Sequence, residues 1–142
     1  MSLQTYVSRR PEDTRRIGRN IGGMATQGTV ISLEGPLGSG KTVLAQGIAE
    51  GLGVKERLTS PTFTLIAEYL GSTRLYHIDL YRIENAAQLD DIGFDDAVNG
   101  QNVAIIEWGK KAKGLLPAEH MAVELSIAAD NSRLITISGR LP

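Results

Sequence analysis

The pattern of apolar and polar positions in the first half of the chain predicts a helix, a strand and a second helix. Proline at 11 suits the first turn of a helix, and a helical spacing of the residues that follow predicts that this helix runs to about residue 24. A continuous apolar run then predicts a buried strand over 29–34. After a glycine-rich segment, residues on one helical face predict a second helix that Gly51 and Gly53 close.

The second half of the chain reads as hairpins, short helices and one buried strand. The expected elements are strands over 63–70 and 73–80 around the turn Gly71-Ser72, helices over 84–91 and 94–98 joined at Gly93, a buried strand over 103–106, and strands over 121–128 and 134–138 around the turn 130–132. This mixture of a central strand–loop–helix unit and flanking hairpins predicts a three-layer α/β domain with a mixed central sheet.

The segment from Gly35 to Thr42 matches the phosphate-loop pattern G-x-x-x-x-G-K-[ST] in full. The strand before it and the helix after it give the motif its expected context, so we expect a P-loop NTPase-like fold. The loop contains glycine at three positions, Gly35, Gly38 and Gly40, which lets backbone N–H groups close around phosphate oxygens. Lys41 supplies a charge for the β- and γ-phosphates, and Thr42 offers its hydroxyl to Mg²⁺.

Two carboxylates follow predicted strands, at the edge where ligands bind in open α/β sheets. Asp79 ends the strand over 73–80, and Glu107 ends the strand over 103–106. Either one could hold magnesium while the other orients water, and a structural role at a strand end is the alternative for each. Thr62 lies in the loop between the glycine-rich segment and Asp79, where nucleotide switches place a threonine that senses the γ-phosphate; an ordinary turn is equally consistent.

Three residues close to these carboxylates in the sequence each have more than one possible role. His77 shares a strand face with Asp79, and we expect a structural role for it. For Arg82 the expected role is an ion pair, with phosphate contact as the alternative. Trp108 follows Glu107 directly, which suits either a core residue or a residue near the site.

Composition limits the class of protein. The 142 residues fit a single domain over 1–142, and 42% hydrophobic residues are enough for one core. The absence of cysteine excludes disulfides and thiolate metal sites, and no apolar run is long enough to cross a bilayer, so we expect a cytoplasmic protein with no membrane partner.

The charge pattern bears on partners. A net charge of -1 shows no basic excess for gripping nucleic acid directly. A local group of arginines is interpreted as a solvated helix face rather than a docking patch: Arg9, Arg10, Arg15, Arg16 and Arg19.

The choice of nucleotide and reaction follows from what the sequence lacks. Residues 90–93 match the GTPase pattern D-x-x-G, but they fall in a predicted helical stretch. The N-K-x-D motif, by which GTPases recognise guanine, does not occur in the sequence. We therefore expect adenine, as ATP or ADP with Mg²⁺. An ATPase, a small-molecule kinase and a nucleotide-gated binding module remain as alternatives, although no arginine-rich lid or acceptor segment supports the kinase.

Four sequence blocks, in order and spacing, resemble the bacterial TsaE (YjeE) family. These blocks are Gly35–Thr42, Ser60-Pro61-Thr62-Phe63-Thr64-Leu65, His77-Ile78-Asp79-Leu80-Tyr81-Arg82 and Ile105-Ile106-Glu107-Trp108, with Leu116-Pro117 further on. The resemblance implies an ATPase required for the threonylcarbamoyl-adenosine modification of tRNA. It would act with the partner proteins TsaB and TsaD, reset their complex by hydrolysis, and meet tRNA only indirectly through that complex.

The resemblance also assigns residue roles. It places the phosphates on Leu37, Gly38, Ser39, Gly40, Lys41 and Thr42. It places Mg²⁺ at Thr42 and Glu107, with Asp79 close by. Thr62 would belong to a switch-like loop, Trp108 would lie near the nucleotide, and Arg133 would reach the adenine side. Pro36 and Gly109 depart from the family pattern, but neither removes a needed chemical group.

Overall fold

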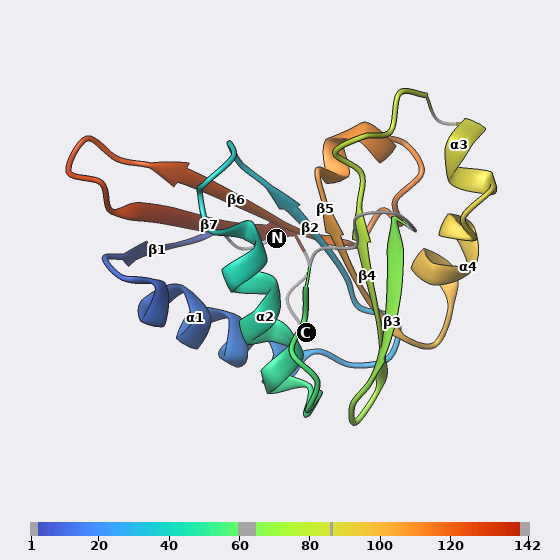
Figure 1. Cartoon of the computed structure of the whole chain (residues 1–142), viewed down its shortest axis with the longest axis horizontal. Helices are drawn as coiled ribbons and strands as arrows, with labels where there is room; N and C mark the ends of the chain where they lie inside the picture. Colours follow the sequence, from blue (N-terminus) through green and yellow to red (C-terminus); the bar gives the residue numbers. More distant parts are fainter. Residues whose placement is uncertain (1–2, 60–64, 86, 140–142) are drawn as a thin grey trace.

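The computed structural model describes residues 3–59, 65–85 and 87–139. The elements follow in the order β1 (Gln4–Ser8), α1 (Pro11–Met24), β2 (Val30–Glu34), α2 (Lys41–Gly51), β3 (Ile66–Leu70), β4 (Arg74–Asp79), α3 (Ala87–Asp90), α4 (Phe94–Asn99), β5 (Val103–Glu107), the 3₁₀ helix η1 (Gly109–Ala112), β6 (Met121–Ile127) and β7 (Arg133–Gly139). All seven strands form one sheet in the order β1-β7-β6-β2-β5-β4-β3 (Figure 1).

The centre of this sheet is parallel and its edges are antiparallel. Strand β2 pairs in parallel with both β5 and β6, and β5 pairs in parallel with β4. The hairpins β3–β4 and β6–β7 and the pair β1–β7 are antiparallel. The mixed sheet and both hairpins predicted from the sequence are thus confirmed, and the parallel strands direct their carboxyl ends to one edge.

The central strands β2, β4 and β5 are apolar on both faces, and both faces are covered there. On β5, Val103 and Ile105 belong to the core beneath α1 and α2, whereas Ala104 and Ile106 belong to the core that includes residues of α3 and α4. Figure 1 shows α1 and α2 side by side and α3 and α4 at the end of the sheet that carries β3 and β4. A strand covered on both faces must be apolar at successive positions, which explains the continuous run in β5.

Glycines allow helices α1 and α2 to pack very closely. A methyl group on Gly18 or Gly22 of α1 would lie 2.4 or 2.1 Å from a carbonyl oxygen of α2. The reverse holds for Gly47 and Gly51 of α2, where a methyl group would lie 2.2 or 2.3 Å from a carbonyl oxygen of α1. Each helix therefore spaces two glycines four residues apart on the face that meets the other, so the backbones are in direct contact.

The structure adds one strand and corrects two boundaries relative to the sequence predictions. Strand β1 was not predicted, because its side chains alternate little in burial and four of its five residues are exposed. The helix predicted over 84–91 is shorter, since the Gln88 side chain accepts hydrogen bonds from the N–H groups of Glu84 and Asn85 and the helix begins only at Ala87. Strand β3 begins at Ile66 rather than at residue 63; residues 60–64 lie outside the described ranges.

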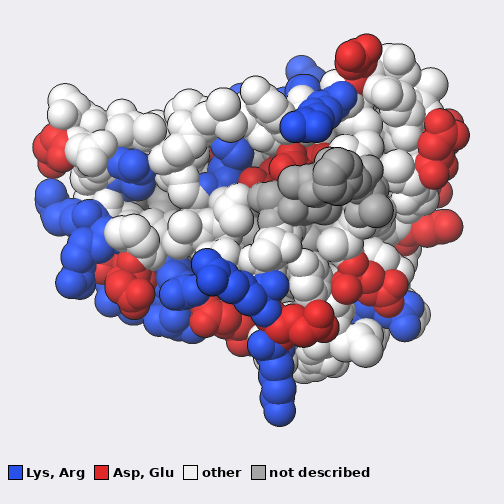
Figure 2. All heavy atoms as spheres, viewed as in Figure 1, with Lys and Arg blue, Asp and Glu red and all other residues white. Residues whose placement is uncertain are grey.

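The arginines around α1 are paired with acidic side chains. The shortest pairs join Arg15 to Glu50 at 2.9 Å and Arg16 to Asp13 at 3.0 Å. The other three arginines also have a carboxylate within 4 Å: Arg9, Arg10 and Arg19. Figure 2 shows this interleaving of basic and acidic side chains on the α1 side of the molecule. The arrangement favours a solvated helix face, as the sequence predicts.

The contact between α1 and α2 can be tested with two neighbouring glycines. Gly22→Ala places a methyl group against the Ile48 carbonyl oxygen, so we expect the free energy of unfolding to fall by about 1–3 kcal/mol. Gly23→Ala is the matched control, since a methyl group there meets nothing within 4 Å and alanine favours a helix by up to about 1 kcal/mol. Urea denaturation measures both. Equal effects of the two substitutions would contradict the close contact.

Candidate functional site

The glycine-rich loop connects the end of the central strand β2 to the start of α2. Gly38 and Gly40 have φ angles of 82° and 103°, in the left-handed region that favours glycine. A methyl group on Gly35 would lie 2.6 Å from the Leu125 carbonyl oxygen, so the loop passes directly against β6. The side chain of Ser39 is wholly buried beneath the loop. The loop therefore presents backbone and the positive end of the α2 dipole at the edge of the sheet.

Lys41 is folded back over this loop. Its Nζ donates hydrogen bonds to the carbonyl oxygens of Gly35 at 2.6 Å and Pro36 at 3.1 Å, and lies 4.2 Å from the centre of the Trp108 ring. Burial lowers the pKa of Lys41, and the charge of Glu107 is the largest opposing influence. The lysine that the sequence assigns to phosphates thus donates hydrogen bonds to carbonyl oxygens of its own loop.

Glu107 lies at the centre of the site. Strand β5 ends with this residue, and the parallel register sets it opposite Asp79 of β4. The side chain is buried, with Oε2 at 2.6 Å from His77 Nε2 and Oε1 accepting a 3.4 Å hydrogen bond from Thr42 Oγ1. The carboxylate therefore joins the start of α2 to the end of β4.

Asp79 is less enclosed than Glu107. Its Oδ1 accepts a hydrogen bond from the N–H of Tyr81 at 3.0 Å. Burial raises the pKa of Asp79, and the charge of Glu107 raises it further, while that backbone hydrogen bond opposes the rise. The two carboxylates therefore have different environments despite lying opposite each other in the sheet.

Trp108 covers the site from a constrained backbone position. Its φ of 63° is in the left-handed region, which is uncommon for a residue other than glycine. The indole ring lies 5.2 Å from the ring of Tyr81, whose carbonyl oxygen accepts a hydrogen bond from Lys111 Nζ. Next in the chain, Gly109 is buried against Ser32, and a methyl group there would lie 2.2 Å from Ser32 Oγ.

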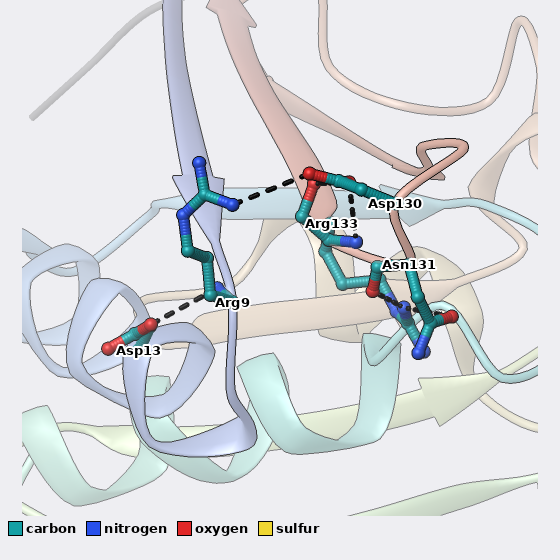
Figure 3. A network of polar contacts seen from close by, with 6 residues as sticks. Arg9, Asp13, Asp130, Asn131 and Arg133 are labelled. Carbon is teal, nitrogen blue, oxygen red and sulfur yellow. Dashed lines mark hydrogen bonds and ion pairs between the residues drawn. The ribbon is translucent and has the colours of Figure 1, made fainter.

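Arg133 lies on the other side of the glycine-rich loop, at the start of β7. Its guanidinium donates hydrogen bonds to the carbonyl oxygens of Gly38 at 3.2 Å and Asn131 at 2.5 Å. Nearby, Arg9 pairs with Asp130 at 3.4 Å (Figure 3). These residues border a cavity of about 350 Å³ that the loop also lines. The lining residues are Ser8, Arg9, Arg10, Pro11, Thr14, Gly38, Ser39, Gly40, Val43, Asn131 and Arg133.

The structure brings together most, but not all, of the site residues expected from the sequence. Lys41, Thr42, Asp79, Glu107 and Trp108 converge at the carboxyl edge of the sheet. Leu37 is exposed at the loop surface, and Arg133 contacts the opposite side of the loop.

Other candidates are placed differently. Thr62 lies outside the described residues. Arg82 is exposed, and among the described residues no ion pair is found for it. Sequence reasoning missed the contact of His77 with Glu107 and the contribution of Ser8 and Thr14 to the cavity. The two-residue spacing of His77 and Asp79 indicated a shared strand face, but nothing in the sequence indicated the cavity beside β1.

The residues at Glu107 suit a cation that takes few protein ligands. Within the described ranges, no group of three or more histidine and carboxylate side chains could hold a metal by itself. The hydroxyl of Thr42 and the carboxylate of Glu107 are hard oxygen donors on neighbouring elements. Mg²⁺ in phosphate-binding proteins takes one or two such ligands, with water and phosphate oxygens completing its shell. The donor set therefore fits Mg²⁺ beside a bound phosphate.

The fold and this site define an α/β protein whose seven-stranded mixed sheet carries a phosphate-loop sequence at the end of a central strand. The chain belongs to the TsaE family. The family model, described as threonylcarbamoyl adenosine biosynthesis protein TsaE, matches residues 8–135. None of the helices in the described ranges has the length and apolar character needed to cross a membrane.

Individual relatives agree with the family match. The chain is 42% identical over 132 residues to the tRNA threonylcarbamoyladenosine biosynthesis protein TsaE of Treponema pallidum, covering 93% of this chain and 98% of that one. It is 41% identical over 129 residues to the Bacillus subtilis protein of the same name, covering 90% and 80%. The crystal structure of Bacillus subtilis YdiB superposes with a TM-score of 0.82 at 35% identity, covering 97% of this chain and 86% of that chain.

The contact between Gly109 and Ser32 gives a test of the turn after Glu107. Gly109→Ala should lower the free energy of unfolding by about 1–3 kcal/mol, because the added methyl group overlaps Ser32 Oγ. In a Ser32→Ala background the hydroxyl is gone, and the same substitution should cost less. Urea denaturation of the four proteins in this double-mutant cycle gives the coupling. A cost that is the same in both backgrounds would show that Ser32 does not constrain Gly109.

Proposed function

We propose that this protein binds and hydrolyses ATP with Mg²⁺, and that it does so in the threonylcarbamoyl-adenosine modification of tRNA. The observation that supports the nucleotide site is the convergence of Lys41, Thr42 and Glu107 at the end of the glycine-rich loop. Membership of the TsaE family supports the biological role, since the named relatives are tRNA threonylcarbamoyladenosine biosynthesis proteins.

In this proposal the phosphates of ATP take the place of the loop carbonyls as partners of Lys41. The ammonium group lies beside the carbonyl oxygens of Gly35 and Pro36, and a short movement would bring it to the β- and γ-phosphates. Backbone N–H groups from Leu37 to Thr42 and the N-terminus of α2 would hold the same phosphates. Trp108 covers Lys41 and would limit access of water to this end of the nucleotide.

The remaining groups have separate roles in the proposal. Thr42 and Glu107 would hold Mg²⁺, which when bound neutralises charge on the phosphates and aligns them. Asp79, whose pKa is raised by burial, would orient the attacking water. The nucleoside would occupy the cavity of about 350 Å³ beside Arg133, on the far side of the loop. Thr62 belongs to the proposed site as a residue that senses the γ-phosphate.

The proposed partners are the proteins TsaB and TsaD, which the family resemblance implies. ATP hydrolysis would reset their complex between cycles and would be weak without them. The paired arginines on α1 agree with tRNA being held by these partners rather than by this chain.

Lys41→Ala should weaken the binding of Mg·ATP by about tenfold or more, or about 1.4 kcal/mol, because the charge aimed at the phosphates is lost. Isothermal titration calorimetry with ATP and ADP measures the affinity. Lys110→Ala is the matched control, since it removes the same charge from an exposed side chain that pairs with Glu124. If the two variants bind ATP equally well, Lys41 does not hold phosphate.

Glu107→Gln should lower ATP turnover by about tenfold or more and lower nucleotide affinity less, because the carboxylate would hold the Mg²⁺ that aligns the phosphates for reaction. The assay is ADP release with and without TsaB and TsaD, which should stimulate the wild-type protein. Glu34→Gln is a control at another strand end, where the carboxylate accepts a hydrogen bond from the Lys110 N–H. Wild-type binding without turnover, even with both partners in single-turnover conditions, would exclude the ATPase and indicate a nucleotide-gated binding module.

A further inference from the structure

A buried histidine lies directly behind the carboxylate assigned to Mg²⁺. His77 of β4 has no solvent-exposed surface, and its Nε2 lies 2.6 Å from Glu107 Oε2. Because alternate residues of a strand face the same side, His77 and Asp79 project to the face of the sheet that α2 covers. The other ring nitrogen, Nδ1, is also buried and has no hydrogen-bond partner among the described residues. Within the part of the chain that the structure describes, the one hydrogen bond found for this ring is therefore that to Glu107.

The two oxygens of Glu107 have different partners. Oε2 faces the ring of His77, and Oε1 faces the hydroxyl of Thr42 at 3.4 Å. An ionised carboxylate only accepts hydrogen bonds, so a hydrogen bond to Glu107 requires a proton on Nε2 of His77. With Oε2 held in this way, the side chain cannot turn freely, and Oε1 stays directed at the start of α2.

The surroundings of His77 show that its polarity is not needed for packing. On the α2 side of β4 and β5, the neighbours of His77 away from the carboxyl ends of the strands are apolar, namely Leu75, Val103 and Ile105, while Asp79 and Glu107 follow at the strand ends. A buried ring with an unpaired nitrogen costs free energy that an apolar side chain at the same position would not. The position therefore carries a polar group whose use is the contact with Glu107, and ligands of metals are commonly oriented by such a neighbour.

We propose that His77 is a positioning residue that holds Glu107 with one oxygen, Oε1, directed at the Mg²⁺ site next to Thr42. This inference rests on the proposed function, because it concerns how the chain would hold the metal with its nucleotide. It assigns no contact between His77 and the nucleotide or the metal.

Three variants separate positioning from a merely structural role. His77→Leu removes the donor at similar volume, and His77→Gln keeps an N–H close to the place of Nε2. His120→Leu is the matched control, because His120 is the other histidine of the chain and its ring contacts the Pro117 carbonyl oxygen in the turn before β6. For each protein, nucleotide affinity is measured by calorimetry with and without Mg²⁺, and ATP turnover is measured over a range of Mg²⁺ concentrations.

For His77→Leu we expect nucleotide affinity without Mg²⁺ to stay within about twofold of wild type. The Mg²⁺ concentration that gives half-maximal turnover should rise about 10–100-fold, the usual cost of losing a group that orients a metal ligand. His77→Gln should recover most of this loss, and His120→Leu should show none of it. The inference is overturned if affinity falls equally with and without Mg²⁺, or if the Gln and Leu variants behave alike.

A measurement on the nucleotide-free protein tests the hydrogen bond itself and does not depend on folding of the Leu variant. Long-range ¹H–¹⁵N NMR correlation distinguishes the two imidazole tautomers, and with two histidines in the chain the signals are readily assigned through His120→Leu. We expect the proton of His77 on Nε2. A proton on Nδ1 alone would overturn the inference, since Nε2 could not then donate to Glu107.

Failure of the inference can be told apart from failure of the proposed function. If wild type binds Mg·ATP but never hydrolyses it with TsaB and TsaD, the ATPase proposal fails, and the effect of Mg²⁺ on nucleotide affinity still decides the role of His77. If wild type hydrolyses ATP and His77→Leu has an unchanged Mg²⁺ requirement, only the role of His77 is excluded. If wild type binds no nucleotide, both are contradicted.

Discussion

The parallel pairing of β5 with its two neighbours is the constraint on which the candidate site depends. Pairing with β4 sets Glu107 opposite Asp79, and pairing with β2 sets Glu107 opposite Leu33, two residues before the glycine-rich loop. A shift of one residue in either register would turn Glu107 to the other face of the sheet, away from Thr42. The run of β5 is apolar on both faces up to Glu107, so the charged residue at its end distinguishes one register from the next, and the register sets which loop and strand-end groups meet.

A second constraint acts through α2, the helix that carries Lys41 and Thr42 at its first turn. Its backbone lies directly against α1 at Gly47 and Gly51, which leaves no side chains between the helices that could adjust to a shift. Helices α1 and α2 also pack against the same face of the sheet, and their apolar side chains form one continuous core with it. The start of α2 is therefore held from two directions, by α1 and by the sheet, and the hydroxyl of Thr42 is held 3.4 Å from Glu107 Oε1. Rigid elements of this kind position functional groups more precisely than loops do.

Local patterns predicted the parts of the fold that depend on neighbouring residues. The helix from Pro11 to Met24, the strand before the loop and both hairpins follow from periodicity and turn residues, and the structure confirms them. Strand β1 was not predicted, because an exposed edge strand needs no apolar alternation. Its pairing with β7 also joins residues more than a hundred positions apart, which no local pattern reveals. The short helix α3 was predicted too long because Gln88 caps the chain by a side-chain contact that periodicity does not reveal.

By itself the sequence determined the chemistry that is available: a glycine-rich loop with Lys41 and Thr42, and two carboxylates at strand ends, because residue identity and short spacings encode these directly. Only the tertiary structure decided how those groups combine. It set Glu107 between Thr42 and His77, which are separated from it by 65 and 30 residues, and it formed the cavity beside Arg133 from both ends of the chain. The physical reason is that strand order, register and helix packing bring together residues whose separation along the chain carries no periodic signal.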